Sequence, residues 1–265
     1  MLQDISLEST TSADGTEIAY FRRGVGPALV ITHGSVALSD DWIPATEHLA
    51  PYFTCLVMDR RGHGRSGDAI EYDLSTEAAD IAAVMAVAGP GAHLMGHSYG
   101  ALCALAYAET GRVEGTLLLF EPPLAVDGPV AGEGLHTYRE LIAAGEYDAA
   151  IEYAVINIVR VPPDQIPALR EAPLWATLVE LSPTWTRELE QIDNLGADLT
   201  HYASINAAAH LIAGTETTPF LYASAQALVD VLPTASITYL DGMDHFAHVK
   251  EPAAFAAAVR AAASR

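Results

Sequence analysis

Short apolar runs bounded by glycine or charged residues recur along the chain, and longer stretches with helical periodicity separate them. Uninterrupted apolar runs of this kind are typical of strands that are buried on both faces of a parallel sheet. The runs are Ala28 to Thr32, Cys55 to Met58, His93 to Met95, Thr116 to Phe120, Leu211 to Ala213 and Ile237 to Leu240. Because these runs alternate with helical stretches, the pattern predicts right-handed crossovers and an open α/β sheet.

Local signals delimit three further elements. Residues 75–88 place alanine and larger apolar side chains on one helical face, with Ser75 and Thr76 as candidate caps. The alanine-rich segment Pro252 to Ala263 predicts a closing helix. Near the start, Ile5 to Leu7 and Ile18 to Phe21 predict an antiparallel hairpin that leads into the sheet.

Residues 122–205 lack the strand pattern and contain amphipathic segments interrupted by the proline pairs Pro122-Pro123 and Pro162-Pro163. A structureless loop of this length inside a compact domain is implausible, so the segment predicts an inserted helical cap. A longer run of crossover helices is the alternative. The predicted core is then residues 1–121 together with residues 206–265, and the predicted cap is residues 122–205.

The composition excludes several classes of partner. The 265 residues are 51% hydrophobic, and 13 basic against 34 acidic residues give a formal net charge of −21. That charge repels phosphate backbones and anionic lipids, so neither nucleic acid nor a membrane is an expected partner. No targeting signal and no apolar run of about 20 residues is visible, which predicts a cytoplasmic protein. A homodimer is left open.

The segment 96–100, GHSYG, follows one predicted strand directly and precedes an alanine-rich helix. Small residues at both ends let strand and helix approach closely, and the strained residue between them projects its side chain into a cleft. Ser98 is therefore the candidate nucleophile, and the amide of Tyr99 at the helix start is a candidate oxyanion donor. The second donor is predicted in the loop after the strand that ends at Thr32, as the amide of Ser35 or Val36.

These segments, with the loop Asp59 to Ser66 and the late segment Asp241 to Phe246, resemble the α/β-hydrolase family over nearly the whole chain outside the predicted cap. The resemblance implies a mostly parallel, doubly wound sheet and the chain order serine, acid, histidine. It makes Ser98 the nucleophile and His245 the general base. His33 is expected to line the floor of the cleft.

Two residues compete as the acid of the implied triad. Family members commonly carry it in a Gly-x-x-Asp turn after strand seven, but here Thr217 stands where that aspartate would be, and Glu216 lies one residue away. The sixth predicted strand ends instead at Glu121, before two prolines. Certain lipases and a lactonase acting on zearalenone carry their acid after strand six, which favours Glu121 and leaves Glu216 as the alternative.

The resemblance implies a serine hydrolase that cleaves carboxylic esters or lactones of an apolar small molecule through an acyl-serine intermediate. Three aromatic residues of the predicted cap are candidate substrate contacts, with packing inside the cap as the other interpretation: Tyr138, Trp175 and Trp185. No set of metal ligands has a suitable spacing, so neither a metal nor another cofactor is predicted.

Other activities in this family use the same turn with a serine at its centre. A cofactor-free haloperoxidase or perhydrolase, or a hydrolase of carbon–carbon bonds, uses the same three residue types in this family. A hypothesis from another class is a non-catalytic receptor that binds a small ligand such as a lactone, because the fold alone does not establish chemistry. Turnover of a generic ester distinguishes the enzyme from the receptor.

Overall fold

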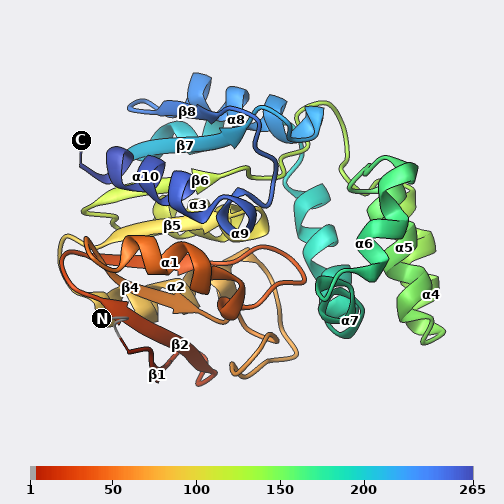
Figure 1. Ribbon diagram of the computed structural model, residues 1–265, viewed down its shortest axis with the longest axis horizontal. Coiled ribbons are helices and arrows are strands. Elements are labelled where there is room, and N and C mark those ends of the chain that lie inside the picture. The colour runs from red at the N-terminus through yellow and green to blue at the C-terminus, as the bar shows by residue number, and fades with distance from the viewer. Residues whose placement is uncertain (1–3, 265) are drawn as a thin grey trace.

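One sheet of eight strands forms the centre of the molecule in the computed structural model, which describes residues 4–264 (Figure 1). The strands are β1 Ser6–Thr11, β2 Glu17–Gly24, β3 Ala28–Thr32, β4 Thr54–Met58, β5 His93–His97, β6 Thr116–Phe120, β7 Ala208–Gly214 and β8 Ser236–Leu240. Their order across the sheet is β1-β2-β4-β3-β5-β6-β7-β8. β2 pairs antiparallel with both β1 and β4, whereas β3 to β8 run parallel, which confirms the predicted mostly parallel α/β sheet.

Alternate residues of each central strand enter two separate apolar layers. In β3, Val30 belongs to one layer, and Leu29 and Ile31 belong to the other. The first layer packs against α2 Leu74–Ala88, α3 Tyr99–Thr110 and α8 Pro219–Val231; the second packs against α1 Ile43–Leu49, α9 Ala247–Lys250 and α10 Pro252–Ala263. Since both faces of the sheet are covered, most positions of the central strands are apolar, and this is why the sequence shows continuous runs.

Several predicted boundaries hold and others shift. β3, β6 and α10 occupy the predicted residues, and the leading hairpin is confirmed with Leu7 opposite Phe21. The predicted caps of α2 are wrong, because Asp73 rather than Ser75 or Thr76 occupies that position. The Asp73 carboxylate accepts the backbone N–H of Thr76 at 2.8 Å, and it extends the helix start to Leu74.

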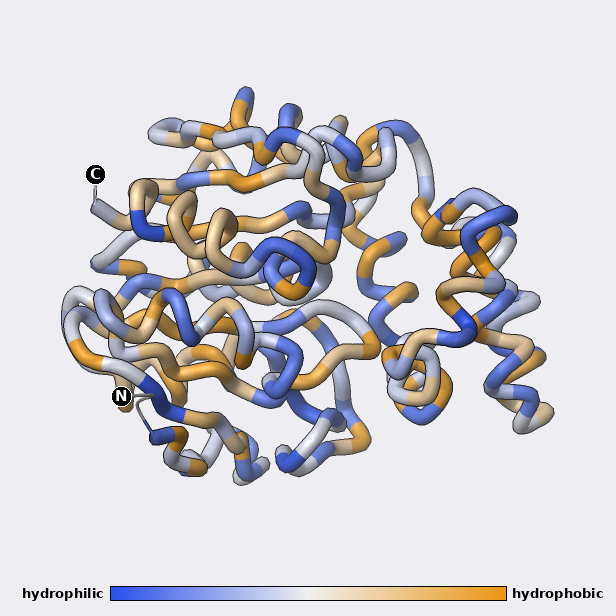
Figure 2. Tube along the Cα trace, in the orientation of Figure 1, coloured by the Kyte–Doolittle hydropathy of each residue, from blue (hydrophilic) through white to orange (hydrophobic). Residues whose placement is uncertain are grey.

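Four helices are inserted between β6 and β7, and we refer to them as the inserted helices: α4 Gly134–Ala143, α5 Tyr147–Asn157, α6 Ile166–Glu171 and α7 Leu174–Asn194. Figure 1 shows them beside one another, beyond the end of the sheet at which the parallel strands finish, with α7 nearest the strands. In Figure 2 apolar and polar positions intermingle along these helices, as expected for amphipathic helices that pack on each other. Short 3-10 helices cover Ser39–Trp42, Pro163–Gln165 and Thr200–Ser204.

None of the helices between residues 4 and 264 combines the length and apolar character needed to cross a membrane.

Candidate active site

The parallel strands deliver the predicted site residues to one edge of the sheet. Ser98 follows β5 directly, Glu121 follows β6 directly, and the loop that begins at His33 follows β3. His245 lies in the loop between β8 and α9. Because the carboxyl ends of parallel strands share one edge, residues far apart in sequence meet there.

Ser98 occupies a strained turn between β5 and α3. Its backbone has φ of 53° and ψ of −125°, a left-handed conformation that is costly for a residue with a side chain. The turn is tight on both sides: a Cβ at Gly96 would lie 2.4 Å from the carbonyl oxygen of Gly100, and a Cβ at Gly100 would lie 2.4 Å from that of His33. The Ser98 side chain is half-buried, and its hydroxyl has no hydrogen-bond partner among residues 4–264.

Two sets of backbone amides lie next to Ser98. Tyr99 is the first residue of α3, and the first N–H groups of a helix have no partner inside the helix. On the other side, a Cβ built on Gly34 would lie 2.9 Å from the Cβ of Ser98, so the loop after β3 packs directly against the serine. In that loop Val36 adopts a left-handed backbone, with φ of 46°.

Glu121, and not Glu216, contacts the ring of His245. Glu121 Oε2 lies 2.5 Å from His245 Nδ1, and it also accepts the hydroxyl of Thr217 at 2.8 Å. Glu121 Oε1 accepts the backbone N–H of Gly214 at 2.7 Å, so the buried carboxylate is held by three donors. Glu216 is exposed to solvent. In the sequence Thr217 stands out only as a departure from the family pattern, and nothing there indicates its role as a donor to Glu121.

The contact with Glu121 fixes the tautomer of His245. A carboxylate accepts hydrogen bonds, so the ring proton resides on Nδ1 and the lone pair on Nε2 stays free. The backbone of His245 is fixed as well, because His97 Nε2 donates to its carbonyl oxygen at 3.1 Å. Burial, together with the neighbouring histidines, holds the pKa of His97 well below its usual range. His97 is therefore a neutral support for His245.

His33 lies beneath the loop rather than at its surface. Its Nε2 accepts the backbone N–H of Arg60 at 3.0 Å, and its Nδ1 donates to the carbonyl oxygen of Gly34 at 2.8 Å. Burial and the adjacent Arg60 charge lower the pKa of His33 to about 3. Both ring nitrogens are engaged, which leaves neither to hydrogen-bond a substrate.

The three aromatic candidates lie in the interior of the inserted helices. Tyr138 donates its hydroxyl to the carbonyl oxygen of Ser182 at 2.7 Å, and its ring meets that of Trp185 edge-on with centroids 5.8 Å apart. The indole N–H of Trp175 donates to Asp148 at 2.7 Å. These contacts match the packing interpretation, and a contact between any of the three side chains and a substrate stays a prediction.

A buried polar cluster next to the oxyanion loop was not anticipated. Arg60, Glu77 and Glu188 are all fully buried, and the guanidinium of Arg60 pairs with both carboxylates. The sequence signal was the adjacent pair Arg60-Arg61 in the loop Asp59 to Ser66, which follows β4. Arg61 makes a separate ion pair, since it donates twice to the buried Asp80 at 2.7 Å.

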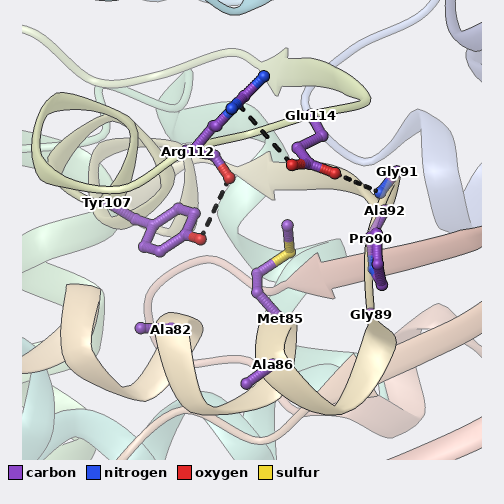
Figure 3. A pocket seen from close by; sticks show the side chains of 10 residues that line it. All are labelled: Ala82, Met85, Ala86, Gly89, Pro90, Gly91, Ala92, Tyr107, Arg112 and Glu114. Carbon is purple, nitrogen blue, oxygen red and sulfur yellow. Dashed lines mark hydrogen bonds and ion pairs between the residues drawn. The ribbon is translucent and has the colours of Figure 1, made fainter.

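A pocket of about 200 Å³ lies elsewhere in the molecule (Figure 3). Its lining includes Met85 of α2, Tyr107 of α3, and Ala92 and Glu114, which precede β5 and β6. It therefore lies at the amino ends of the strands, opposite Ser98. In the described part of the chain, no three His, Cys, Asp or Glu side chains are grouped so that they could hold a metal ion.

The strained serine between β5 and α3, with a histidine and a buried acid from later strand ends, defines the α/β-hydrolase class of fold. The chain matches the alpha/beta hydrolase family over residues 29–258 and belongs to that family. A solved alpha/beta hydrolase from Sphaerobacter thermophilus DSM 20745 is 32% identical, with a TM-score of 0.88 over 96% of this chain and 99% of that one.

Curated relatives match over a shorter range. A non-heme haloperoxidase from Rhodococcus erythropolis is 38% identical over 47% of this chain and 48% of the relative. A pimeloyl-[acyl-carrier protein] methyl ester esterase from Xanthomonas campestris pv. campestris (strain B100) is 38% identical over 49% of this chain and 50% of that protein. The chain thus spans about half the length of these two relatives.

Proposed function

We propose that the protein is a serine hydrolase that cleaves carboxylic esters or lactones of an apolar small molecule. The observation that carries this proposal is the 2.5 Å contact between the buried Glu121 carboxylate and Nδ1 of a half-exposed His245. Such a contact orients an imidazole and stabilises its protonated form, as a general base requires. Ser98 in its strained turn supplies the nucleophile at the same edge of the sheet.

In the first half of the reaction, Ser98 Oγ attacks the carbonyl carbon of the ester while Nε2 of His245 takes the hydroxyl proton. The carbonyl oxygen becomes negatively charged, and the amides of Tyr99 and of Ser35 or Val36 stabilise it. Glu121 remains ionised and stabilises the imidazolium. Collapse of the tetrahedral intermediate breaks the ester C–O bond, and the imidazolium protonates the departing alkoxide.

In the second half, water attacks the acyl-serine while His245 accepts one of its protons. The new tetrahedral intermediate releases Ser98 Oγ, which recovers its proton from the imidazolium, and the carboxylic acid product leaves. For a lactone the alcohol and the acid are parts of one product. Every proton is returned, so the cycle needs no co-reactant besides water.

The inserted helices act as a cap over this site in our proposal. Their position beyond the strand ends supports this role, since α7 lies between the sheet and the other inserted helices (Figure 1). The relative named as a methyl ester esterase supports an ester as the substrate class.

Perhydrolysis is a second candidate, and the similarity to the non-heme haloperoxidase favours it. Here hydrogen peroxide replaces water as the attacking group on the acyl-serine and yields a peracid. Formation of a peracid from acetate and hydrogen peroxide, measured by bromide oxidation, separates this activity from simple hydrolysis.

The proposal is tested by covalent labelling with a fluorophosphonate, followed by identification of the modified peptide by mass. Wild type is expected to react at Ser98, and Ser98→Ala to show no labelling there. Glu121→Gln is expected to slow labelling about 10³- to 10⁴-fold, because the imidazole loses the carboxylate that orients it. Glu216→Gln, the matched control, is expected to stay within about twofold of wild type.

Each alternative predicts a different result. If labelling collapses only in Glu216→Gln, the acid is Glu216 and the assignment of Glu121 fails. If folded wild type is not labelled and hydrolyses no 4-nitrophenyl ester, Ser98 is not an activated nucleophile. Thermal stabilisation by a lactone in the absence of turnover would then favour the receptor.

A further inference from the structure

Glu188 is a fully buried carboxylate on α7, whose exposed face carries other charges. Its Oε1 pairs with Nη2 of Arg60, and the ring nitrogen Nε2 of His63 lies 3.5 Å from the same oxygen. Both partners belong to the loop after β4. A side chain of the inserted helices thus reaches into the core beside the candidate site.

Arg60 transmits this contact to Tyr99. The guanidinium lies over the Tyr99 ring, with Cζ 4.7 Å from the ring centroid, a distance suited to a cation–π interaction. The hydroxyl of Tyr99 lies 3.1 Å from that of Tyr72, so the face of the ring and its hydroxyl both have a partner. Tyr99 is the first residue of α3, and its backbone amide is one of the two proposed oxyanion donors.

Arg60 also supports the second donor. Its backbone N–H donates to His33 Nε2 at 3.0 Å, and His33 Nδ1 donates to the carbonyl oxygen of Gly34 at 2.8 Å. Gly34 immediately precedes Ser35, the start of the pair of candidate donors. One arginine therefore contacts both loops that would form the oxyanion hole.

We propose that Glu188 is a positioning residue for the oxyanion hole, acting through Arg60. The proposal rests on the function proposed above. The correct seating of α7 places the Glu188 carboxylate, the carboxylate holds the guanidinium on Tyr99, and the amides on both sides of Ser98 are aligned as a result. The contact between Glu188 and Arg60 then couples the packing of α7 against the core to the alignment of the oxyanion donors.

Several buried polar atoms of the cluster have no hydrogen-bond partner in the part of the chain that the structure describes. Within residues 4–264, Glu188 Oε2, Glu77 Oε2, and Nε and Nη1 of Arg60 are buried without a hydrogen-bond partner. Burying such groups destabilises a fold, and apolar residues are often at least as stable in their place. A role in positioning explains why the cluster is built from charges.

The variant Glu188→Gln separates positioning from stability. Glu77 remains 3.6 Å from Arg60 Nη1, so the guanidinium keeps one carboxylate partner. The cluster then holds one positive and one negative charge, whereas ionised Glu188 adds a second negative charge. We therefore expect the variant to fold with a thermal midpoint no lower than that of wild type.

The experiment compares steady-state hydrolysis of a 4-nitrophenyl ester by full-length wild type and Glu188→Gln. The value of kcat is expected to fall about 10- to 100-fold, because misaligned amides stabilise the oxyanion less well. KM is expected to change less than about threefold, since the oxyanion forms only after substrate binds. Affinity for a phenylboronic acid, which forms a tetrahedral adduct on the serine, is expected to fall with kcat.

Two matched variants act as controls. Glu190→Gln removes an equal charge from the same helix, but Glu190 pairs with Arg139 of α4, outside the cluster. Asp68→Asn weakens the ion pair of 2.9 Å between Asp68 and Arg187, which also connects α7 to the core. Both controls are expected to retain kcat within about twofold of wild type.

The inference is overturned if active wild type and Glu188→Gln share the same kcat. It is also overturned if Asp68→Asn loses as much activity, which would assign the effect to helix docking in general. A fall in kcat that accompanies a large fall in thermal midpoint would assign Glu188 a purely structural role. Wild type that neither turns over esters nor reacts with fluorophosphonate overturns the proposed function itself.

Discussion

Two buried carboxylates lie near the ends of the strands, and the protein holds them in different ways. Glu121 accepts hydrogen bonds from Gly214, Thr217 and His245, so both of its oxygens are satisfied. Glu188 is equally buried, but one of its oxygens has no partner among the described residues. Burial raises the pKa of Glu188 to about 7, although the positive charge of Arg60 opposes the change.

The difference shows that two carboxylates can be equally buried and yet have very different sets of hydrogen-bond donors around them. Directed donors stabilise the charged form, whereas a dry surrounding disfavours it. Glu121 gains its donors from backbone and side chains of the core, which are fixed by the sheet. Glu188 comes from an inserted helix, and its partners are the guanidinium of Arg60, the hydroxyl of Ser35 and the ring of His63. Because burial outweighs these contacts, its charge depends on pH near neutrality.

The largest expected effect that sharpens this comparison is the pH dependence of stability caused by Glu188. Its pKa in the folded protein, about 7, lies above the ordinary value of 4.5, so the folded state binds more protons between these values. The free energy of unfolding therefore falls as pH rises through this window, by up to about 3 kcal/mol. Glu188→Gln lacks this contribution.

The check is urea denaturation of wild type and Glu188→Gln at about pH 5 and about pH 8. The glutamine variant is expected to gain stability relative to wild type as pH rises. The groups that act on the Glu188 charge are shared by both proteins and lie on several elements: Ser35, Arg60, His63, Tyr72, Glu77, Tyr99, Cys103, Tyr138 and Arg187. A stability difference that does not change with pH would contradict the prediction.

A smaller effect is expected at Glu121 when one of its donors is removed. Thr217→Val deletes the hydroxyl that lies 2.8 Å from Glu121 Oε2. The loss is expected to cost about 1–2 kcal/mol of unfolding free energy, and kcat is expected to fall about tenfold or less because two donors remain. Urea denaturation and ester hydrolysis measure the two quantities.

The adjacent Thr218→Val is the control for this substitution. The hydroxyl of Thr218 is buried but has no hydrogen-bond partner within residues 4–264. Its removal is expected to leave stability equal or slightly higher. Equal losses in both variants would mean that the bond to Glu121 contributes nothing specific.

The smallest effect is expected at the rim of the Arg60 cluster. The hydroxyl of Tyr72 donates to Glu77 at 2.8 Å and lies 3.1 Å from that of Tyr99, and Tyr72→Phe removes both contacts. We expect a cost of about 1 kcal/mol and a kcat within about threefold of wild type, because Arg60 still lies over Tyr99. Tyr107→Phe, whose hydroxyl lies 3.4 Å from the carbonyl oxygen of Arg112, is the control. A tenfold loss of kcat in Tyr72→Phe would contradict this ranking.

The fold could be predicted from the sequence because its central elements have strong local signals. The segment Thr116 to Phe120 is buried at every position, and it is apolar after its first residue because both faces of β6 are covered. The cap at Asp73 was missed because Ser75 carries an equally suitable side chain, and only the direction of the chain before α2 decides between them. The exact residue at which a helix begins depends on this backbone geometry, whereas the presence of the helix follows from the pattern of its apolar residues.

The candidate site divides in the same way. Ser98 lies in a local motif, so the sequence marks it directly. The contact of Glu121 with His245 joins residues 124 positions apart, and the sequence left Glu216 as a competitor. The burial of Glu188 could not be predicted, because a glutamate on an amphipathic helix is normally part of the solvated face. Its burial depends on Arg60, 128 positions away.

The end of β6 leaves the sheet through a left-handed residue, with φ of 49° at Glu121, and its carboxylate reaches past β7 to a ring carried by the loop after β8. Thr217, at the end of β7, brings its own side chain to the same oxygen. Two neighbouring strands therefore converge on one point in space. A carboxylate carried by either strand could therefore meet the same imidazole nitrogen without any movement of the histidine. What the site requires is the location of one oxygen atom, and the fold offers two strand ends from which a side chain can supply it.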